Sequence, residues 1–438
     1  MQAVSCPTLS VEGNQQKEEL ASIFRSLGGD FPEKAHLNLD QKRAFFDITT
    51  CRTAAKGGHM WRCGTCSHCV NQYNSCLNRH CPKCQGKARY QWVSARMKDV
   101  INCRYFHVVF TLPHELNPLI AFNPVPMLRL LFRSVSQTLL AFGRDPKHLG
   151  GELGVITVLH TWTQKLKRHY HLHCIIPGGA ISPTGEEWIP CGNPKYLFPE
   201  AALAKTFRRL YWHGNGSNKN ADSENPIPVK FTGLRDLLLK QALILPSQHQ
   251  DYFKPEKVRS LENQLYKKRW VVYAKQAFGG PDKVIKYLGC YTHRVAISNR
   301  RILAHRNGLV SFSYKDRKNE NAIRTMQLPD KEFALRFLQH VIPSRFMKIR
   351  SYGFLANRKK QACVKHLHDL LGSPETHDGE QAQVAAPEVD QVEKDGETLV
   401  RVCPKCGKQT LVRSHPLSDF TMRLGWKAIW DNPYRDTS

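Results

Sequence analysis

The sequence predicts a mixed α and β fold with an antiparallel sheet, preceded by a cysteine-rich module. Two neighbouring runs, residues 154–162 and 169–177, have the length and apolar content of the two strands of a hairpin. A third run, residues 105–113, is apolar and ends in proline, as a buried strand does. Seven of the fifteen cysteines fall between Cys51 and Cys84, before these strands. We therefore expect the cysteines and the sheet in different domains.

Composition divides the chain into five expected segments. Residues 373–398 are acidic and have almost no large apolar side chains, which predicts a disordered linker. Residues 213–228 are rich in Gly, Ser and Asn and predict a flexible insertion. In order, the segments are 1–50 (helical), 51–100 (cysteine-rich module), 101–372 (main domain with the insertion), 373–398 (linker) and 399–438 (tail).

The charge balance favours a partner made of phosphates. The chain has 64 Lys and Arg against 37 Asp and Glu, a net charge of +27. Each phosphate that a basic side chain neutralises releases counterions, so such an excess favours nucleic acid. A merely soluble basic surface is the alternative. No 18-residue apolar stretch and no apolar signal segment are present, so we expect a cytoplasmic protein with no membrane partner.

The cysteine-rich module contains two non-overlapping Cys-x-x-Cys pairs, Cys63 with Cys66 and Cys81 with Cys84. Structural Zn²⁺ takes four tetrahedral ligands, and two such pairs separated by a short loop supply them. In a reducing compartment this spacing indicates a metal site rather than disulfides. The remaining candidate ligands leave room for a second zinc ion without requiring one; they are Cys51, His59, Cys69, Cys76 and His80.

A further pair, Cys403 and Cys406, lies in the tail within CPKCG. By itself it is half a zinc site. Cys363 and His366 could complete it.

Basic and aromatic residues surround the Cys81–Cys84 pair in NRHCPKCQGKARYQW. A zinc module of this composition usually binds nucleic acid, although a purely structural role is an alternative. The expected DNA-binding residues are Arg79, Lys83, Lys87, Arg300 and Arg301.

Three histidines alternate in HYHLHCIIPGG: His169, His171 and His173. Alternate residues of a strand share one face, so the three imidazoles point the same way. Imidazole is the commonest nitrogen ligand for a metal ion. The strand therefore predicts either a metal site or a half-exposed polar face.

The preceding strand offers a third ligand. A turn centred near residues 166–167 would place His160 opposite His173. Gln164 would then lie opposite His169 on the same face. His160 becomes the third candidate ligand, with Gln164 and His169 as rivals. Three ligands with open positions suit a divalent ion that acts as a Lewis acid.

A predicted helix that begins at Pro281 carries two tyrosines, Tyr287 and Tyr291. Four residues make about one helical turn, so both side chains share one face. Lys286 and Arg294 place positive charge beside them. Tyrosines at this spacing are usually core residues, but a tyrosine can also be a nucleophile that forms a covalent intermediate.

These motifs occur together in an order that resembles a known family. The cysteine module is followed by FTLPHEL, HTWTQ, HYHLHC with PGG, WVVYAKQAFGGP, YLGCYTHRVAISN and HVIPSRFMKIRSYGFLAN. From roughly residue 40 to 360 the chain resembles the zinc-binding, two-tyrosine rolling-circle transposases of bacterial insertion sequences. They belong to the HUH nuclease superfamily, named for a His-hydrophobic-His motif. His171 and His173 match that motif, and Tyr287 and Tyr291 match the two tyrosines.

The resemblance implies an antiparallel-sheet HUH nuclease domain with an N-terminal zinc-binding module and helical additions. It implies a DNA transposase of a mobile element that cuts and rejoins single-stranded DNA through a 5′-phosphotyrosine. Mg²⁺ or Mn²⁺ on the histidines would polarise the phosphate, structural Zn²⁺ would fold the module, and Lys286 or Arg294 would stabilise developing charge. The implied partners are single-stranded or hairpin element ends and target DNA. The implied location is the bacterial cytoplasm, at the nucleoid.

Three rivals remain at this level. A plasmid replication initiator or relaxase uses the same chemistry without moving an element. A tyrosine recombinase needs no metal and leaves the histidine strand unexplained. A non-catalytic zinc-dependent DNA-binding protein predicts that Tyr287 and Tyr291 are dispensable.

Overall fold

The structure is a computed structural model that describes residues 18–194, 196–216, 230–276, 289, 294–316, 319–373 and 400–417. Contacts divide the chain into two compact units. The first unit combines residues 1–87, 297–341 and 383–438. The second combines residues 88–296 and 342–382. The units therefore do not follow sequence order. We expected residues 297–341 in the main domain, but they belong to the same unit as the N-terminal module.

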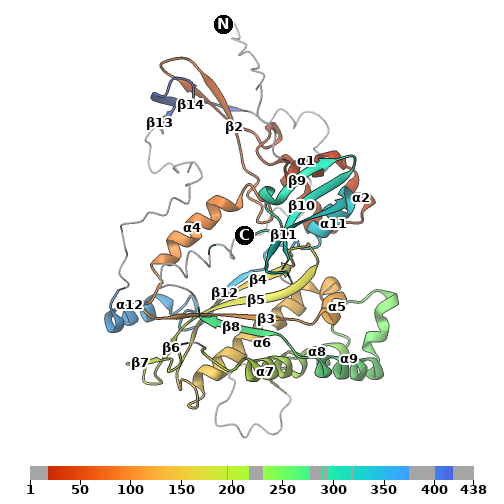
Figure 1. The fold of residues 1–438 in the computed structure, drawn as a ribbon, viewed down its shortest axis with the longest axis vertical. Helices are drawn as coiled ribbons and strands as arrows, with labels where there is room; N and C mark the ends of the chain where they lie inside the picture. The colour runs from red at the N-terminus through yellow and green to blue at the C-terminus, as the bar shows by residue number, and fades with distance from the viewer. Residues whose placement is uncertain are drawn as a thin grey trace. The chain divides into compact units, whose positions relative to one another are not determined.

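Within the described residues, an antiparallel sheet of five strands forms the centre of the second unit (Figure 1). The order is β12-β4-β5-β3-β8, and every neighbouring pair is antiparallel. The three apolar runs recognised in the sequence form the three central strands, so the predicted α+β class is confirmed. The bounds are β3 (Tyr105–Thr111), β4 (Gly154–Trp162), β5 (Arg168–Pro177), β8 (Val272–Gln276) and β12 (Ile349–Gly353).

Alternation along the central strands gives the sheet two different faces. Phe106, Val108 and Phe110 of β3 point into the largest apolar core, together with Leu172 and Cys174 of β5. Helices cover this face, with α6 and α7 running beneath the sheet in Figure 1. They are α5 (Asn117–Phe122), α6 (Pro124–Arg144), α7 (Glu200–His213), α8 (Leu234–Leu239) and α9 (Pro255–Lys267).

The opposite face of the sheet packs against two other helices. Val158 and Ile175 lie with Trp92 and Val93 of α4 (Gln85–Met97) in one cluster. A second cluster joins the sheet to α12 (Lys360–Leu371). The Asp99 carboxylate connects both helices, because it lies 2.9 Å from Arg96 Nε and 2.7 Å from Lys360 Nζ.

Helices from the first and the middle segment of the first unit share one aromatic core. Phe24 of α1 (Leu20–Ser26) stacks on Phe45 of α3 (Leu39–Thr50), with ring centroids 4.8 Å apart. Phe337 of α11 (Asp330–Leu338) meets Phe24 edge to face at 5.8 Å. A three-stranded sheet accompanies them, with β9 (Ile302–Arg306), β10 (Leu309–Asp316) and β11 (Ala322–Pro329) in the order β11-β10-β9.

A four-stranded sheet completes the first unit. Its order is β13-β14-β1-β2, so two strands of the tail extend a hairpin of the cysteine-rich module. The strands are β1 (Gly58–Cys63), β2 (Cys69–Tyr73), β13 (Val400–Val402) and β14 (Gln409–Leu417).

The short elements elsewhere are α2 (Phe31–Lys34), η1 (Ala54–Lys56), η2 (His114–Leu116), β6 (Gly179–Ile181), β7 (Trp188–Pro190), η3 (Ser247–Phe253) and η4 (Asn299–Arg301).

Several expected features lie outside the described residues. They are most of the insertion (217–229), nearly all of the acidic linker (374–398), and the part of the expected tyrosine helix that contains Tyr287 and Tyr291. Among the helices that are described, none is both long enough and apolar enough to cross a bilayer.

Gly353 at the end of β12 provides a test of the sheet edge. Its φ is +63°, and a Cβ there would lie 1.5 Å from the Leu153 carbonyl oxygen. Gly353→Ala combines a left-handed backbone with this clash, so we expect a loss of at least about 2 kcal/mol of stability. Thermal unfolding followed by circular dichroism measures it. Gly192→Ala is the control, because a Cβ at Gly192 meets nothing within 4 Å; equal melting temperatures for both variants would contradict the account.

Candidate active site

Three histidines come together on the α4 face of the sheet. His160 lies on β4, and His171 and His173 lie on β5. One nitrogen from each ring lies within 4.8 Å of the others. All three side chains are buried, with 4%, 9% and 8% of their surface exposed. The alternative of a half-exposed polar strand face therefore does not hold for these three histidines. Their rings could hold one metal ion.

The register that brings them together differs from the predicted register by two residues. His160 pairs with His171, and Val158 pairs with His173. The expected pairing of His160 with His173 was therefore wrong, and so was that of Gln164 with His169, because β4 ends before Gln164. A shift of two residues keeps every side chain on its face, so the histidines still meet.

A tight connection explains the different register. The Thr163 N–H donates to the Lys167 carbonyl at 2.9 Å, and the Thr163 Oγ1 accepts from the Lys167 N–H at 3.1 Å. Leu166 has a φ of +57° and is fully buried. An irregularity between His160 and Trp162 shifts the pairing further. Gln164 falls in this turn, whereas His160 lies in one cluster with His171 and His173.

A backbone contact fixes the tautomer of His171. Its Nδ1 lies 2.8 Å from the His169 carbonyl oxygen. A carbonyl only accepts, so Nδ1 must carry the proton and donate. The lone pair of a neutral His171 is then on Nε2, which is the atom that would bind an ion.

His107 of β3 is a fourth member of the site that sequence reasoning missed. Its Nε2 lies 2.8 Å from His173 Nδ1, and the two rings are nearly parallel. If Nδ1 of His173 donates this hydrogen bond, its Nε2 has the lone pair for a metal. Burial lowers the pKa of His107 to about 4. Burial also lowers the pKa of His173 well below its usual value, and neighbouring positive charge lowers it further. Both imidazoles are therefore neutral at pH 7, which is the form in which a histidine binds a metal ion.

One described residue of the segment that carries the two tyrosines, Gly289, packs against the helix α4, which lies on this face. Gly289, midway between Tyr287 and Tyr291, is helical and buried. A Cβ at Gly289 would lie 2.3 Å from Val93 Cγ2, so the glycine packs directly on α4. Arg294 is exposed, and its charge is among those that lower the pKa of His173. Lys286, Tyr287 and Tyr291 themselves lie outside the described residues.

Eight of the described cysteines form two groups of four, where the sequence predicted one zinc site and left room for a second. Cys51, Cys76, Cys81 and Cys84 make the first, and Cys63, Cys66, Cys403 and Cys406 make the second. The prediction that Cys63 and Cys66 share a zinc ion with Cys81 and Cys84 was wrong. The suggestion that Cys363 and His366 complete the tail pair was also wrong, because Cys63 and Cys66 do so.

The first group has the geometry of a zinc site. Cys84 Sγ lies 3.5 Å from Cys51 Sγ and 3.6 Å from Cys76 Sγ. Zn–S bonds of about 2.3 Å in a tetrahedron separate sulfurs by about 3.8 Å. Contacts from the surrounding thiols lower the pKa of Cys84. This group joins the end of α3 to the start of α4, and the donor set fits a structural Zn²⁺.

The predicted DNA-binding residues have different surroundings. Lys83 Nζ lies 2.5 Å from Glu19 Oε2, and Arg301 Nε donates to the Ser313 carbonyl at 2.8 Å. Burial lowers the pKa of the Arg79 guanidinium. Arg300 is exposed, and the Lys87 side chain lies outside the described residues. Arg300 is therefore the most accessible of those that are described.

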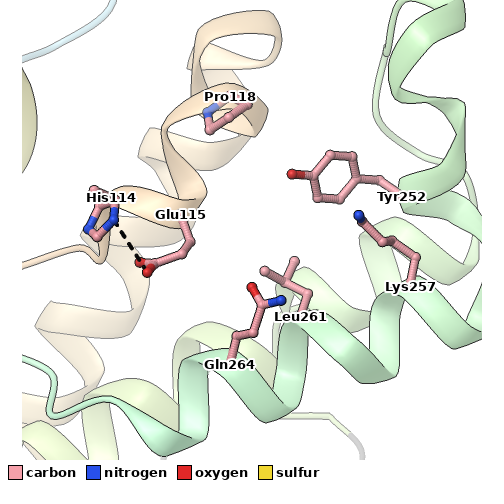
Figure 2. A pocket seen from close by; sticks show the side chains of 7 residues that line it. All are labelled: His114, Glu115, Pro118, Tyr252, Lys257, Leu261 and Gln264. Atoms are coloured by element: carbon pink, nitrogen blue, oxygen red, sulfur yellow. Dashed lines mark ion pairs between the residues drawn. The ribbon is translucent and has the colours of Figure 1, made fainter.

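A separate pocket of about 250 Å³ lies between η2 with α5 on one side and η3 with α9 on the other. Figure 2 shows Glu115 beside His114 and, across the opening, Tyr252, Lys257 and Gln264. None of its lining residues belongs to the histidine or cysteine groups. It offers no set of metal ligands, so the histidine cluster remains the candidate active site.

Comparison with known proteins gives matches to two family models. Residues 154–362 match the model described as "Putative transposase" (Y2_Tnp). This range contains the strands β4 and β5 with their histidines, and Tyr287 and Tyr291. Residues 23–112 match the IS91-type "Transposase zinc-binding domain", which contains the first cysteine group.

Two relatives extend over most of the chain. "Putative transposase y4qJ" of Sinorhizobium fredii is 38% identical over 395 residues, which cover 90% of this chain and 94% of the relative. "Transposase for insertion sequence element IS801" of Pseudomonas savastanoi pv. phaseolicola is 28% identical over 326 residues, 73% of this chain and 70% of the relative. No solved structure matches.

Replacement of Cys84 tests the first cysteine group. Cys84→Ser removes a sulfur that contacts two others, so we expect the loss of one bound zinc ion per chain. Zinc content of the purified protein, measured by elemental mass spectrometry, gives the result. Cys69→Ser is the control, since Cys69 belongs to neither group; loss of zinc from the control alone would refute the assignment.

The identity of the third histidine ligand is tested by metal binding. His160→Ala should weaken Mn²⁺ binding at least about tenfold, as should His171→Ala, because each removes a ring nitrogen from the cluster. His169→Ala should leave the affinity nearly unchanged, because the contact to His171 uses the His169 backbone carbonyl. Isothermal titration calorimetry of the full chain measures all three. If His169→Ala weakens binding and His160→Ala does not, the third ligand is His169.

Proposed function

Because the chain belongs to the transposases that combine an IS91-type zinc-binding domain with a Y2_Tnp domain, we propose that it cleaves and rejoins single-stranded DNA through a covalent phosphotyrosine. A transposase acts on DNA, and the net charge of +27 suits that partner. The observation that carries the proposal is the cluster of His160, His171 and His173, buried on one sheet face.

The histidines would hold a divalent ion at the scissile phosphate. Such an ion supplies Lewis acidity and draws charge from the phosphate oxygens. His160, His171 and His173 would supply three nitrogen ligands, which would leave the remaining coordination positions of the ion for phosphate oxygens and water. His107 keeps His173 in orientation, and the His169 carbonyl does the same for His171.

The donor set bears on which ion binds. Mg²⁺ prefers oxygen ligands and gives up its waters reluctantly. Mn²⁺ accepts imidazole nitrogen more readily, as do the other transition metals. Three buried imidazoles therefore favour Mn²⁺ over Mg²⁺, and Mn²⁺ is the ion with which to probe the site.

A tyrosine oxygen would be the nucleophile. The phenol loses its proton, the oxygen forms a bond to phosphorus, and the bond from phosphorus to the 3′ oxygen breaks. The products are a 5′-phosphotyrosine and a strand that ends in a 3′-hydroxyl, which takes up a proton. The reverse reaction with another 3′-hydroxyl rejoins DNA without a nucleotide cofactor, because the phosphotyrosine keeps the energy of the phosphodiester.

Tyr287 and Tyr291 are the proposed nucleophiles. Gly289 between them packs on α4, and α4 packs on the histidine face of the sheet. Two tyrosines one helical turn apart could each hold a strand. Arg294, whose charge already acts on His173, is suited to stabilise the phosphate in the transition state. Lys286 is a second candidate for that role.

A covalent-transfer experiment tests the proposal. The full chain is incubated with Mn²⁺ and labelled single strands from the element's ends, and label that stays with protein is measured on a denaturing gel. Tyr287→Phe with Tyr291→Phe should abolish the covalent label, because the nucleophilic oxygens are gone. Tyr196→Phe, an exposed tyrosine outside this segment, should leave it unchanged.

Two outcomes would contradict the proposal. Covalent label that persists in the double variant would exclude both tyrosines as nucleophiles. Binding of the strands without label, with Mn²⁺ and with Mg²⁺, would favour a non-catalytic DNA-binding protein.

A further inference from the structure

We propose that a second zinc ion joins the first and last chain segments of the first unit. Its ligands are Cys63 and Cys66 of the N-terminal module and Cys403 and Cys406 of the tail. The matched zinc-binding domain covers residues 23–112 and contains only the first two of these ligands. The Y2_Tnp match ends at residue 362, before the tail. The complete site is therefore not described by either match.

The sulfur positions fit a tetrahedral ion. Cys63 Sγ lies 3.7 Å from Cys406 Sγ, and Cys66 Sγ lies 3.7 Å from Cys403 Sγ. Sulfurs bound to one zinc ion are about 3.8 Å apart. Both contacts join one cysteine of the module to one of the tail. Neither pair could form the site alone.

The two pairs lie in the same kind of turn. The Cys63 carbonyl accepts from the Ser67 N–H at 3.0 Å, and the Cys403 carbonyl accepts from the Gly407 N–H at 2.9 Å. Ser67 and Gly407 both have positive φ, +57° and +70°. The Cys66 N–H also points at Cys63 Sγ, at 3.4 Å. Two matching turns that face each other are the arrangement in which pairs of Cys-x-x-Cys bind one zinc ion.

The sheet that holds the tail has little apolar core of its own. Its buried apolar cluster consists of Trp61, Leu411, Cys63 and Cys403, and two of these are proposed ligands. A module with so few buried side chains usually needs a metal to be stable. Arg401 adds one contact, because its guanidinium lies 4.1 Å from the centre of the Trp61 ring. We therefore expect the pairing of β14 with β1 to depend on the ion.

The charge around the site suits four thiolates. Four thiolates on Zn²⁺ carry a net charge of −2. The segments 58–73 and 400–417 contain no Asp or Glu, so no carboxylate competes with sulfur for the metal. Their basic residues offset the negative charge; they are Arg62, Arg401, Lys405, Lys408 and Arg413. Four sulfur ligands select Zn²⁺ over the hard divalent ion proposed for the histidines.

Metal stoichiometry of the full chain tests the proposal without reference to DNA cleavage. Elemental mass spectrometry should find two zinc ions per wild-type chain and one in Cys403→Ser with Cys406→Ser. Cys363→Ser is the matched control and should keep two, because Cys363 belongs to neither group. Cys406→His should also keep two, since imidazole replaces thiolate as a zinc ligand.

A second readout separates metal loss from general misfolding. Amide hydrogen exchange of residues 400–417 should become fast in the tail double variant, while exchange in α3 stays slow. A tail double variant that retains two zinc ions would overturn the proposal. So would a wild-type chain with one zinc ion whose tail exchanges as fast as that of the variant.

Discussion

The two-residue alternation of the antiparallel pair β4 and β5 is the constraint on which the candidate site depends. It sends Leu159 and Leu172 into the large core and turns His160 and His171 to the opposite face. Burial of the apolar side fixes which face each histidine occupies. A slip of one residue would put the histidines into the core, where unpaired imidazoles are costly. A slip of two residues leaves every side chain on its face. The histidines therefore meet although the observed register differs from the predicted one by two residues.

A different interaction organises the first unit. There, two groups of cysteines bring distant segments together, in addition to the aromatic core between α1, α3 and α11. The first group ties the end of α3 to the start of α4, and α4 continues into the second unit. The second brings in the tail, whose Cys403 lies 337 residues after Cys66. The zinc chemistry proposed for these groups is structural, and the chemistry proposed for DNA belongs to the histidines of the second unit.

Much of the second unit could be predicted because its signals are local. The run 154–162 coincides with β4, and the histidine alternation placed three rings on one face. The register could not be read, since it depends on the left-handed conformation of Leu166 and the irregularity after His160. His107 was missed because a single histidine in an apolar strand is usually a core residue. Only its proximity to His173 gives it a role.

The cysteine grouping was missed for a different reason. Apart from Cys66 with Cys69, which overlaps the first pair, three Cys-x-x-Cys pairs are visible in the sequence, and nearness along the chain suggested joining the first two. The structure distinguishes them: Cys66 and Cys406 are each followed by a turn residue with positive φ, whereas Cys84 is followed directly by a helix. The first and third pairs have similar turns in the folded chain, which their distance along the sequence does not reveal. The assignment of 297–341 to the first unit had no such signal, because it rests on aromatic packing between α1 and α11.

The central claim is that the histidines hold a divalent ion against a DNA phosphate, and pulsed electron paramagnetic resonance of bound Mn²⁺ tests it most directly. The sample is the Tyr287→Phe and Tyr291→Phe protein with an uncut single strand, so that the complex stays intact. The account predicts that one Mn²⁺ couples both to imidazole nitrogens and to phosphorus, and that His171→Ala diminishes the nitrogen coupling. Nitrogen coupling without phosphorus coupling in a strand-bound complex would contradict it, because the ion would then not touch the phosphate.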